Sequence, residues 1–195
     1  MKRSKLFMGL VAGALIFNAC GPAEADPDAI EKAWTLYEEG NVSEAKIIFA
    51  EQSAIGNAEA FVGLGWCAID ENQAATAHTY FQTVSGDSLS DAYAGWCAVS
   101  WSLEDYPSAI MYAQFVLRHD NAYTFSHKSS VTHSDLIWYQ ASSYLHASNY
   151  SQCYAKIREL EPNYTTDINA VNIADVLSDK LESLSADVMA RRWIN

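Results

Sequence analysis

Three histidines in the middle of the chain come nearest, by residue type and clustering, to a metal-binding site. They are His119, His127 and His133, at intervals of eight and six residues. Imidazole is a common zinc ligand, but zinc sites combine three or four ligands at recurring spacings. These intervals match no such pattern, and no cysteine or paired carboxylate accompanies them. We therefore expect no metal or other cofactor. We expect residues 121–133, rich in Ser, Thr and His, to be a solvated loop.

Three cysteines in the body of the chain could act as nucleophiles, metal ligands or disulfide partners. Cys67, Cys97 and Cys153 each fall within an apolar pattern of helical period, and no two have the C-x-x-C spacing of a metal or redox motif. A cysteine in such a pattern behaves as a small hydrophobic residue. We expect buried thiols, with a Cys67–Cys97 disulfide as the alternative in an oxidising compartment.

The common catalytic motifs are missing from the sequence. It contains no G-x-S-x-G, H-E-x-x-H, G-x-x-x-x-G-K-[ST] or G-x-G-x-x-G. Acidic pairs at 70–71 and 104–105 fall at predicted turns, where solvated carboxylates are ordinary. The sequence therefore predicts a protein that is not an enzyme.

Composition predicts a globular domain with an acidic surface. The chain has 195 residues, of which 50% are hydrophobic and 18% charged, and its formal net charge is −12. Removal of the basic residues Lys2, Arg3 and Lys5 would leave −15. Such a surface repels phosphate backbones, so nucleic acid is not an expected partner.

The N-terminus resembles that of bacterial lipoproteins. Three basic residues precede an apolar stretch at 6–17, which is too short to span a bilayer. Residues 17–21 (Phe-Asn-Ala-Cys-Gly) are similar to a lipobox, which implies cleavage before Cys20 and lipidation of its thiol. This predicts a signal peptide at 1–19, a tether at 20–28 and a location on the periplasmic side of the outer membrane. Alternatively, the A-x-A site at 23–25 would release a soluble periplasmic or secreted protein.

A period of 32 residues organises the rest of the chain. Ala45, Ala77 and Ala109 follow this period, as do Trp34 and Trp66. Apolar residues recur every three or four positions in four pairs of segments, the spacing of a helix with one buried face. The predicted pairs are 29–37 with 43–52, 58–70 with 74–84, 91–103 with 106–119, and 134–147 with 150–160.

These segments resemble the tetratricopeptide repeat family. The second copy has Phe61-x2-Leu64-Gly65 followed by Ala74-x2-Ala77-x3-Phe81, and the fourth has Tyr150-x2-Cys153-x3-Ile157 and then Pro162. The resemblance implies an all-α, right-handed α-solenoid of about four helix hairpins. It covers residues 29–164, with 121–133 as a loop insertion. The departures are the period of 32 rather than 34 and a closing proline in the fourth copy only.

In that family the first helix of each pair lines a concave groove. The resemblance therefore implies a protein-binding groove made of Trp34, Tyr37, Val62, Trp66, Ile69, Trp101, Trp138 and Leu145. Exposed aromatic surface of this extent usually marks an interaction site. The expected partner is an unknown envelope protein or peptide. A rim of acidic residues favours a basic or neutral one: Glu59, Asp70, Asp91 and Asp135.

Residues 165–195 predict a C-terminal amphipathic helix of roughly 25 residues, starting after Thr166-Asp167. This helix could cap the last repeat or fill the groove. Two functions follow. The chain is either a lipid-anchored scaffold with a groove open to a partner, or a structural accessory subunit whose groove is filled by its own C-terminal helix. A small-molecule site in an aromatic pocket stays as a third alternative.

Overall fold

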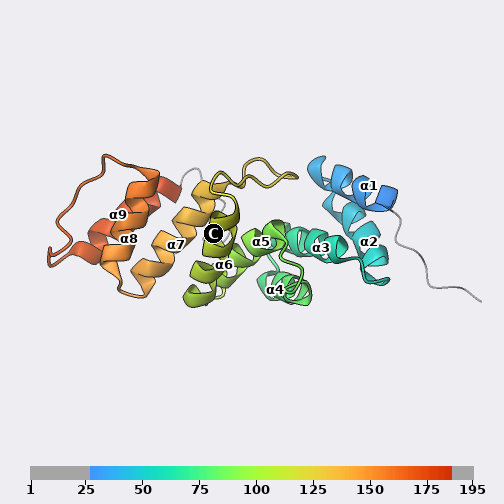
Figure 1. Ribbon diagram of the computed structural model, residues 1–195, viewed down its shortest axis with the longest axis horizontal. Helices are drawn as coiled ribbons and strands as arrows, with labels where there is room; N and C mark the ends of the chain where they lie inside the picture. Colours follow the sequence, from blue (N-terminus) through green and yellow to red (C-terminus); the bar gives the residue numbers. More distant parts are fainter. Residues whose placement is uncertain (1–26, 186–195) are drawn as a thin grey trace, which may run out of the picture.

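The computed structural model describes residues 27–185, which form nine helices and no extended sheet (Figure 1). Eight helices make four consecutive pairs, and the ninth follows a twelve-residue connection. The bounds are α1 Pro27–Glu38, α2 Val42–Ser53, α3 Ala58–Asp70, α4 Ala74–Thr83, α5 Ser90–Ser102, α6 Tyr106–His119, α7 His133–His146, α8 Tyr150–Leu160 and α9 Ile173–Leu184. The predicted all-α solenoid of helix hairpins is confirmed. The predicted signal peptide 1–19 and lipidation site Cys20 lie outside the described residues.

The turn inside each helix pair has the same local structure in all four repeats. Its central residue has a positive φ, between 55° and 82°, at Gly40, Asn72, Glu104 and Ser148. The next residue donates its backbone N–H to the carbonyl five residues earlier, as Asn41 does to Leu36 at 2.8 Å. This is the Schellman ending of a helix. The steps of 32, 32 and 44 residues between these turns place twelve extra residues before the fourth repeat.

Glycines on the first helices let aromatic rings of the second helices approach closely. A side chain at Gly65 would collide with the ring of Phe81, and one at Gly95 would meet the same ring from the following repeat. Gly63 stands in the same relation to Phe49. Both phenylalanines are fully buried. The core therefore forms where the backbone of one helix makes room for a ring.

The connection between α6 and α7, residues 120–132, is not the solvated loop that we predicted. It folds back on itself as a narrow hairpin, in which Phe125 N–H donates to Val131 C=O at 2.9 Å and His133 N–H donates to Tyr123 C=O at 2.7 Å. Figure 1 shows this hairpin reaching from α7 along the array towards α1. Tyr123, Phe125 and Val131 are buried. The prediction failed because these apolar side chains pack on the helices instead of facing water.

The C-terminal helix starts later than we predicted. α9 begins at Ile173, six residues after Asp167. The Asp167 carboxylate accepts the N–H of Asn169 at 3.0 Å in a turn, and so does not cap a helix. α9 packs against α7 and α8, where Leu177 and Leu181 are buried. It therefore covers the last repeat, as terminal caps do in repeat arrays. None of the helices in residues 27–185 is long and apolar enough to cross a bilayer.

Candidate functional site

The residues predicted to line a groove lie on the first helices of the repeats, which contact one another in sequence from α1 to α3, α5 and α7. Six of the eight have relative exposures of 4% or less: Trp34, Tyr37, Val62, Trp66, Ile69 and Trp138. Trp101 and Leu145 are half-buried. The expected open aromatic groove is therefore wrong, because segments of the same chain cover this surface.

The hairpin 120–132 covers the half of the surface that α1, α3 and α5 provide. The Phe125 ring stacks on Trp66 with 4.2 Å between ring centroids. The imidazole of His127 stacks on Trp34 at 3.9 Å, with only 2° between the two planes. Because alternate residues of the hairpin point at successive tryptophans, the hairpin lies on the inner surface as an extended segment.

Polar contacts hold the hairpin in this position. Tyr123 Oη donates to Asp91 Oδ1 at 2.7 Å. The Nδ1 atom of His127 lies 2.7 Å from Glu38 Oε1. At the tip of the hairpin, Lys128 Nζ donates to the Asp70 carboxylate at 2.7 Å. These contacts tie the segment to α5, to the end of α1 and to the end of α3, respectively.

The C-terminal half of the surface is covered differently. Trp138 Nε1 donates to the carbonyl of Leu181 at 3.0 Å, so α9 lies over this tryptophan. Trp101 Nε1 donates to Ser142 Oγ at 2.9 Å. Filling by the C-terminal helix, one of our two alternatives, therefore applies near α7, whereas the hairpin covers the other repeats.

The tryptophans of the first two repeats each contact the start of the next first helix. Trp34 Nε1 donates to Glu59 Oε1 at 2.9 Å, and Trp66 Nε1 donates to the Asp91 carbonyl at 3.1 Å. Both bonds join residues 25 positions apart. Glu59 and Asp91 are the second residues of α3 and α5, where the helix dipole stabilises a carboxylate.

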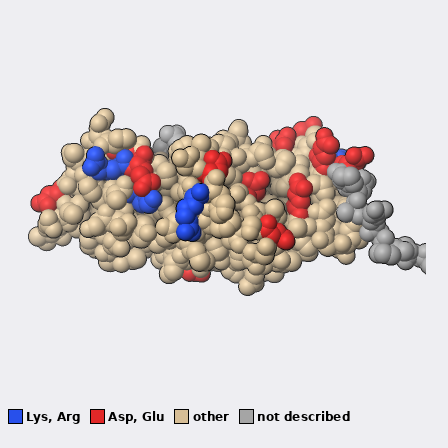
Figure 2. Space-filling model, in the orientation of Figure 1, with Lys and Arg blue, Asp and Glu red and all other residues tan. Residues whose placement is uncertain are grey.

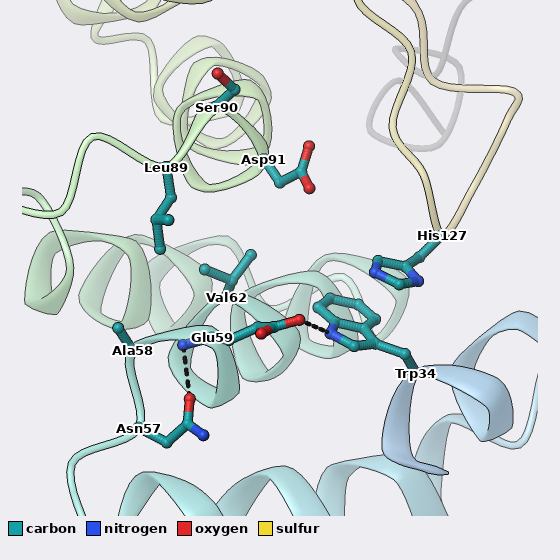
Figure 3. Close-up of a pocket in the computed structure, with 9 residues that line it drawn as sticks. All are labelled: Trp34, Asn57, Ala58, Glu59, Val62, Leu89, Ser90, Asp91 and His127. Carbon is teal, nitrogen blue, oxygen red and sulfur yellow. Dashed lines mark hydrogen bonds between the residues drawn. The ribbon is translucent and has the colours of Figure 1, made fainter. Parts of the chain in front are cut away.

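A cavity of about 510 Å³ stays open where these two helix starts meet the hairpin (Figure 3). It is lined by Trp34, Asn57, Ala58, Glu59, Val62, Leu89, Ser90, Asp91 and His127. Figure 3 shows Val62 between the two acidic residues, Leu89 beside it at the edge of the cavity, and His127 over Trp34 at the opposite side. The cavity thus combines an apolar wall with two carboxylates.

Acidic side chains dominate the charge of the cavity lining. Burial raises the pKa of Asp91 above its ordinary value and the charge of Glu59 adds to this, whereas the Tyr123 hydrogen bond and nearby His127 lower the pKa. A second cavity of about 440 Å³ shares the Trp34 and His127 stack and includes Glu31 and Glu38. Of the predicted acidic rim, Glu59 and Asp91 meet here. Asp70 pairs with Lys128, and Asp135 is buried in the capping box of α7.

The candidate metal and thiol residues do not form reactive sites. Within residues 27–185 there is no group of three His, Cys, Asp or Glu that could hold a metal ion. Cys67, Cys97 and Cys153 are free and buried, so the prediction of buried thiols is confirmed. Burial raises the pKa of Cys67 and of Cys153 to about 12, which disfavours the reactive thiolate.

The hairpin residues at the site were missed by sequence reasoning, although a signal was present. Tyr123, Phe125 and His127 are alternate residues, and Val131 adds an apolar side chain four positions later. Alternation of this kind is typical of an extended segment with one buried face. The abundance of Ser, Thr and His in the same stretch obscured it.

No family model matches the sequence, and no curated protein matches it. Solved structures do match the fold. A MamA structure (MSR-1 C2) has a TM-score of 0.57 at 9% identity, over 82% of this chain and 86% of its own. A MamA point mutant has a TM-score of 0.59 at 8% identity, over 86% of this chain and 92% of its own. A tetratricopeptide repeat protein from Parabacteroides merdae has a TM-score of 0.54 at 12% identity, over 85% of this chain and 62% of its own. The chain therefore has a tetratricopeptide-like fold.

Proposed function

We propose that this protein is a non-enzymatic scaffold for protein–protein interactions, anchored through a lipid on Cys20 to the bacterial outer membrane and facing the periplasm. The tetratricopeptide-like fold supports the scaffold, because stacked helix pairs present extended surfaces to other polypeptides. The resemblance of residues 17–21 to a lipobox supports the anchor.

The hairpin on the inner surface is the observation that decides between an open and a closed concave surface in this proposal. A partner peptide could occupy that surface only by displacing Phe125 from Trp66 and His127 from Trp34. Removing one buried aromatic side chain costs on the order of 3–5 kcal/mol. We therefore favour an accessory subunit whose concave surface is closed by its own chain. The partner then docks where the surface stays open, at the cavity between α3 and α5.

Photo-crosslinking in the native cell tests where the partner docks. One variant carries a photoreactive residue at Leu89, a half-buried wall of the cavity. The matched control carries it at Ile47 on α2, which is 60% exposed and not among the cavity residues. We expect a heavier adduct with a second protein from position 89 only. Adducts from position 47 alone would place the partner on the outer face, and adducts from neither position would contradict the scaffold.

A separate experiment tests the anchor. In cells supplied with a clickable fatty acid, the wild-type protein should carry the label and sediment with the outer membrane. The Cys20→Ala variant should lose both properties. Membrane association without label in the wild type, or label that persists in the variant, would contradict lipidation at this residue.

A further inference from the structure

We propose that the cavity between α3 and α5 binds the guanidinium group of an arginine side chain from a partner polypeptide. The site itself is argued from the cavity, and only the carrier of the arginine rests on the proposed function. No residue lining this cavity is a lysine or an arginine, and the described neighbouring cavity that shares its Trp34 and His127 has none either.

Two carboxylates provide the acceptors. One oxygen of each is already engaged, because Glu59 Oε1 accepts from Trp34 and Asp91 Oδ1 accepts from Tyr123. Among the hydrogen bonds between described residues, Glu59 Oε2 and Asp91 Oδ2 accept none. Within residues 27–185, each acid therefore keeps one oxygen without a hydrogen bond, while its engaged oxygen fixes the orientation of the carboxylate. The two acids come from different helices, so their positions relative to each other are set by the packing of α3 on α5.

The wall between the carboxylates suits the stem of the same side chain. Val62 lies between Glu59 and Asp91 and Leu89 lies beside it (Figure 3), and the two residues give the cavity an apolar lining. Long basic side chains pack their methylene groups on apolar surface and keep the charged head among polar groups. A volume of about 510 Å³ also admits neighbouring residues of the partner.

A guanidinium fits this arrangement better than an ammonium. It is planar and donates from several N–H groups in fixed directions, so it can reach two carboxylates at once, and it is more weakly hydrated. The described surface around α1 to α5 adds long-range attraction, because acidic side chains outnumber basic ones on that half of the face in Figure 2.

Calorimetry with short peptides tests the proposal on the full chain in detergent. The ligands are acetyl-Gly-Arg-Gly-amide, its lysine and citrulline analogues, and free arginine. Citrulline keeps the shape of arginine without its charge. We expect the arginine peptide to bind, the lysine peptide to bind several-fold more weakly and the citrulline peptide at least about tenfold more weakly. Equal binding of the arginine and citrulline peptides would overturn the proposal. Free arginine that binds better than the peptide would overturn the polypeptide as its carrier.

Two variants locate the site. Glu59→Gln and Asp91→Asn keep an acceptor for Trp34 and for Tyr123, and each should weaken the arginine peptide about tenfold. The matched control, Glu182→Gln, removes one charge from an exposed position on α9 and should change binding less than twofold. Wild-type affinity in both cavity variants would refute the site. If variants with wild-type affinity also crosslinked a partner from position 89, the scaffold proposal would hold and the arginine site would be refuted. Arginine binding without any crosslinked partner would contradict the scaffold alone.

Discussion

Replacing Phe125 with alanine removes the side chain that closes the centre of the concave surface. Phe125 is fully buried, and its ring contacts Trp66 at 4.2 Å and Trp34 at 5.9 Å between centroids. Truncating a buried phenylalanine costs about 3–5 kcal/mol. Because the hairpin can collapse into part of the space, we expect the lower end, about 3 kcal/mol, in the free energy of unfolding. Domains are usually stable by about 5–15 kcal/mol, so the variant should still fold.

Urea unfolding followed by circular dichroism measures this loss. With an m-value of about 1–3 kcal/mol/M, a loss of 3 kcal/mol lowers the midpoint by roughly 1–3 M. Acrylamide quenching of tryptophan fluorescence provides a second readout, since the hairpin shields Trp34 and Trp66. Quenching should increase in the variant under native conditions. Phe115→Ala is the matched control, because Phe115 is half-buried on α6 and contacts Tyr93 and not the inner tryptophans. We expect it to cost about 1 kcal/mol and to increase quenching less than Phe125→Ala does, because the only tryptophan in the pocket that Phe115 lines is Trp96.

The reasoning would be refuted if Phe125→Ala cost less than about 1 kcal/mol and left acrylamide quenching at the wild-type level. The hairpin would then not cover the inner surface in solution. The closed form of the scaffold would fail with it, and the partner would have access to Trp66.

Three further predictions follow from the packing and the pKa shifts. Gly65→Ala should destabilise the protein by about 1–3 kcal/mol in urea unfolding, because the added methyl group meets the ring of Phe81; a neutral effect would contradict the close approach. Cys67 and Cys153 should react with a thiol reagent at pH 8 only after denaturation, because burial raises the pKa of each thiol to about 12; rapid reaction of the native protein would contradict their burial. Burial raises the pKa of Asp91 in the folded state, so the folded protein binds this proton more tightly than the unfolded chain does. The resulting stability is present below the ordinary carboxyl pKa and is lost as pH rises through the raised pKa. The urea midpoint of the wild type should therefore fall over this pH range, and the urea midpoint of Asp91→Asn should fall less.

Features that repeat locally could be predicted from the sequence. The helix pairs follow from apolar periodicity, and the ends of all four first helices follow one hydrogen-bonding pattern. The close packing of Phe81 on Gly95 is also visible in the sequence, since Gly63 and Gly95 are 32 residues apart inside helix patterns, as are Phe49 and Phe81. Each of these features depends on contacts between neighbouring segments. These features can therefore be read from the sequence of one repeat and its neighbour.

Features that depend on distant segments could not be predicted in the same way. The tryptophans were placed on the correct helices, but their burial depends on Phe125 and His127, which are more than 55 residues further along the chain. The start of α9 failed for a local reason. Asp167 has the residue type of a helix cap, but its carboxylate accepts a hydrogen bond within a turn, and Val171, which lies within the predicted helix, is exposed. The residue type shows that a side chain can cap a helix, but the local backbone conformation decides which N–H group donates to that side chain.

The coverage of the inner surface also decides what kind of partner remains. A solenoid of this type carries an apolar surface on its first helices, and water disfavours leaving it exposed. Here the twelve extra residues before the fourth repeat supply a cover from within the chain, and that cover is aromatic where it meets Trp34 and Trp66. Because this apolar surface is already buried by the hairpin, a partner would gain little from burying it again. What stays open beside it is a cavity with two carboxylates, so the recognition that we propose at this face would depend mainly on charge and on the geometry of hydrogen-bond donors.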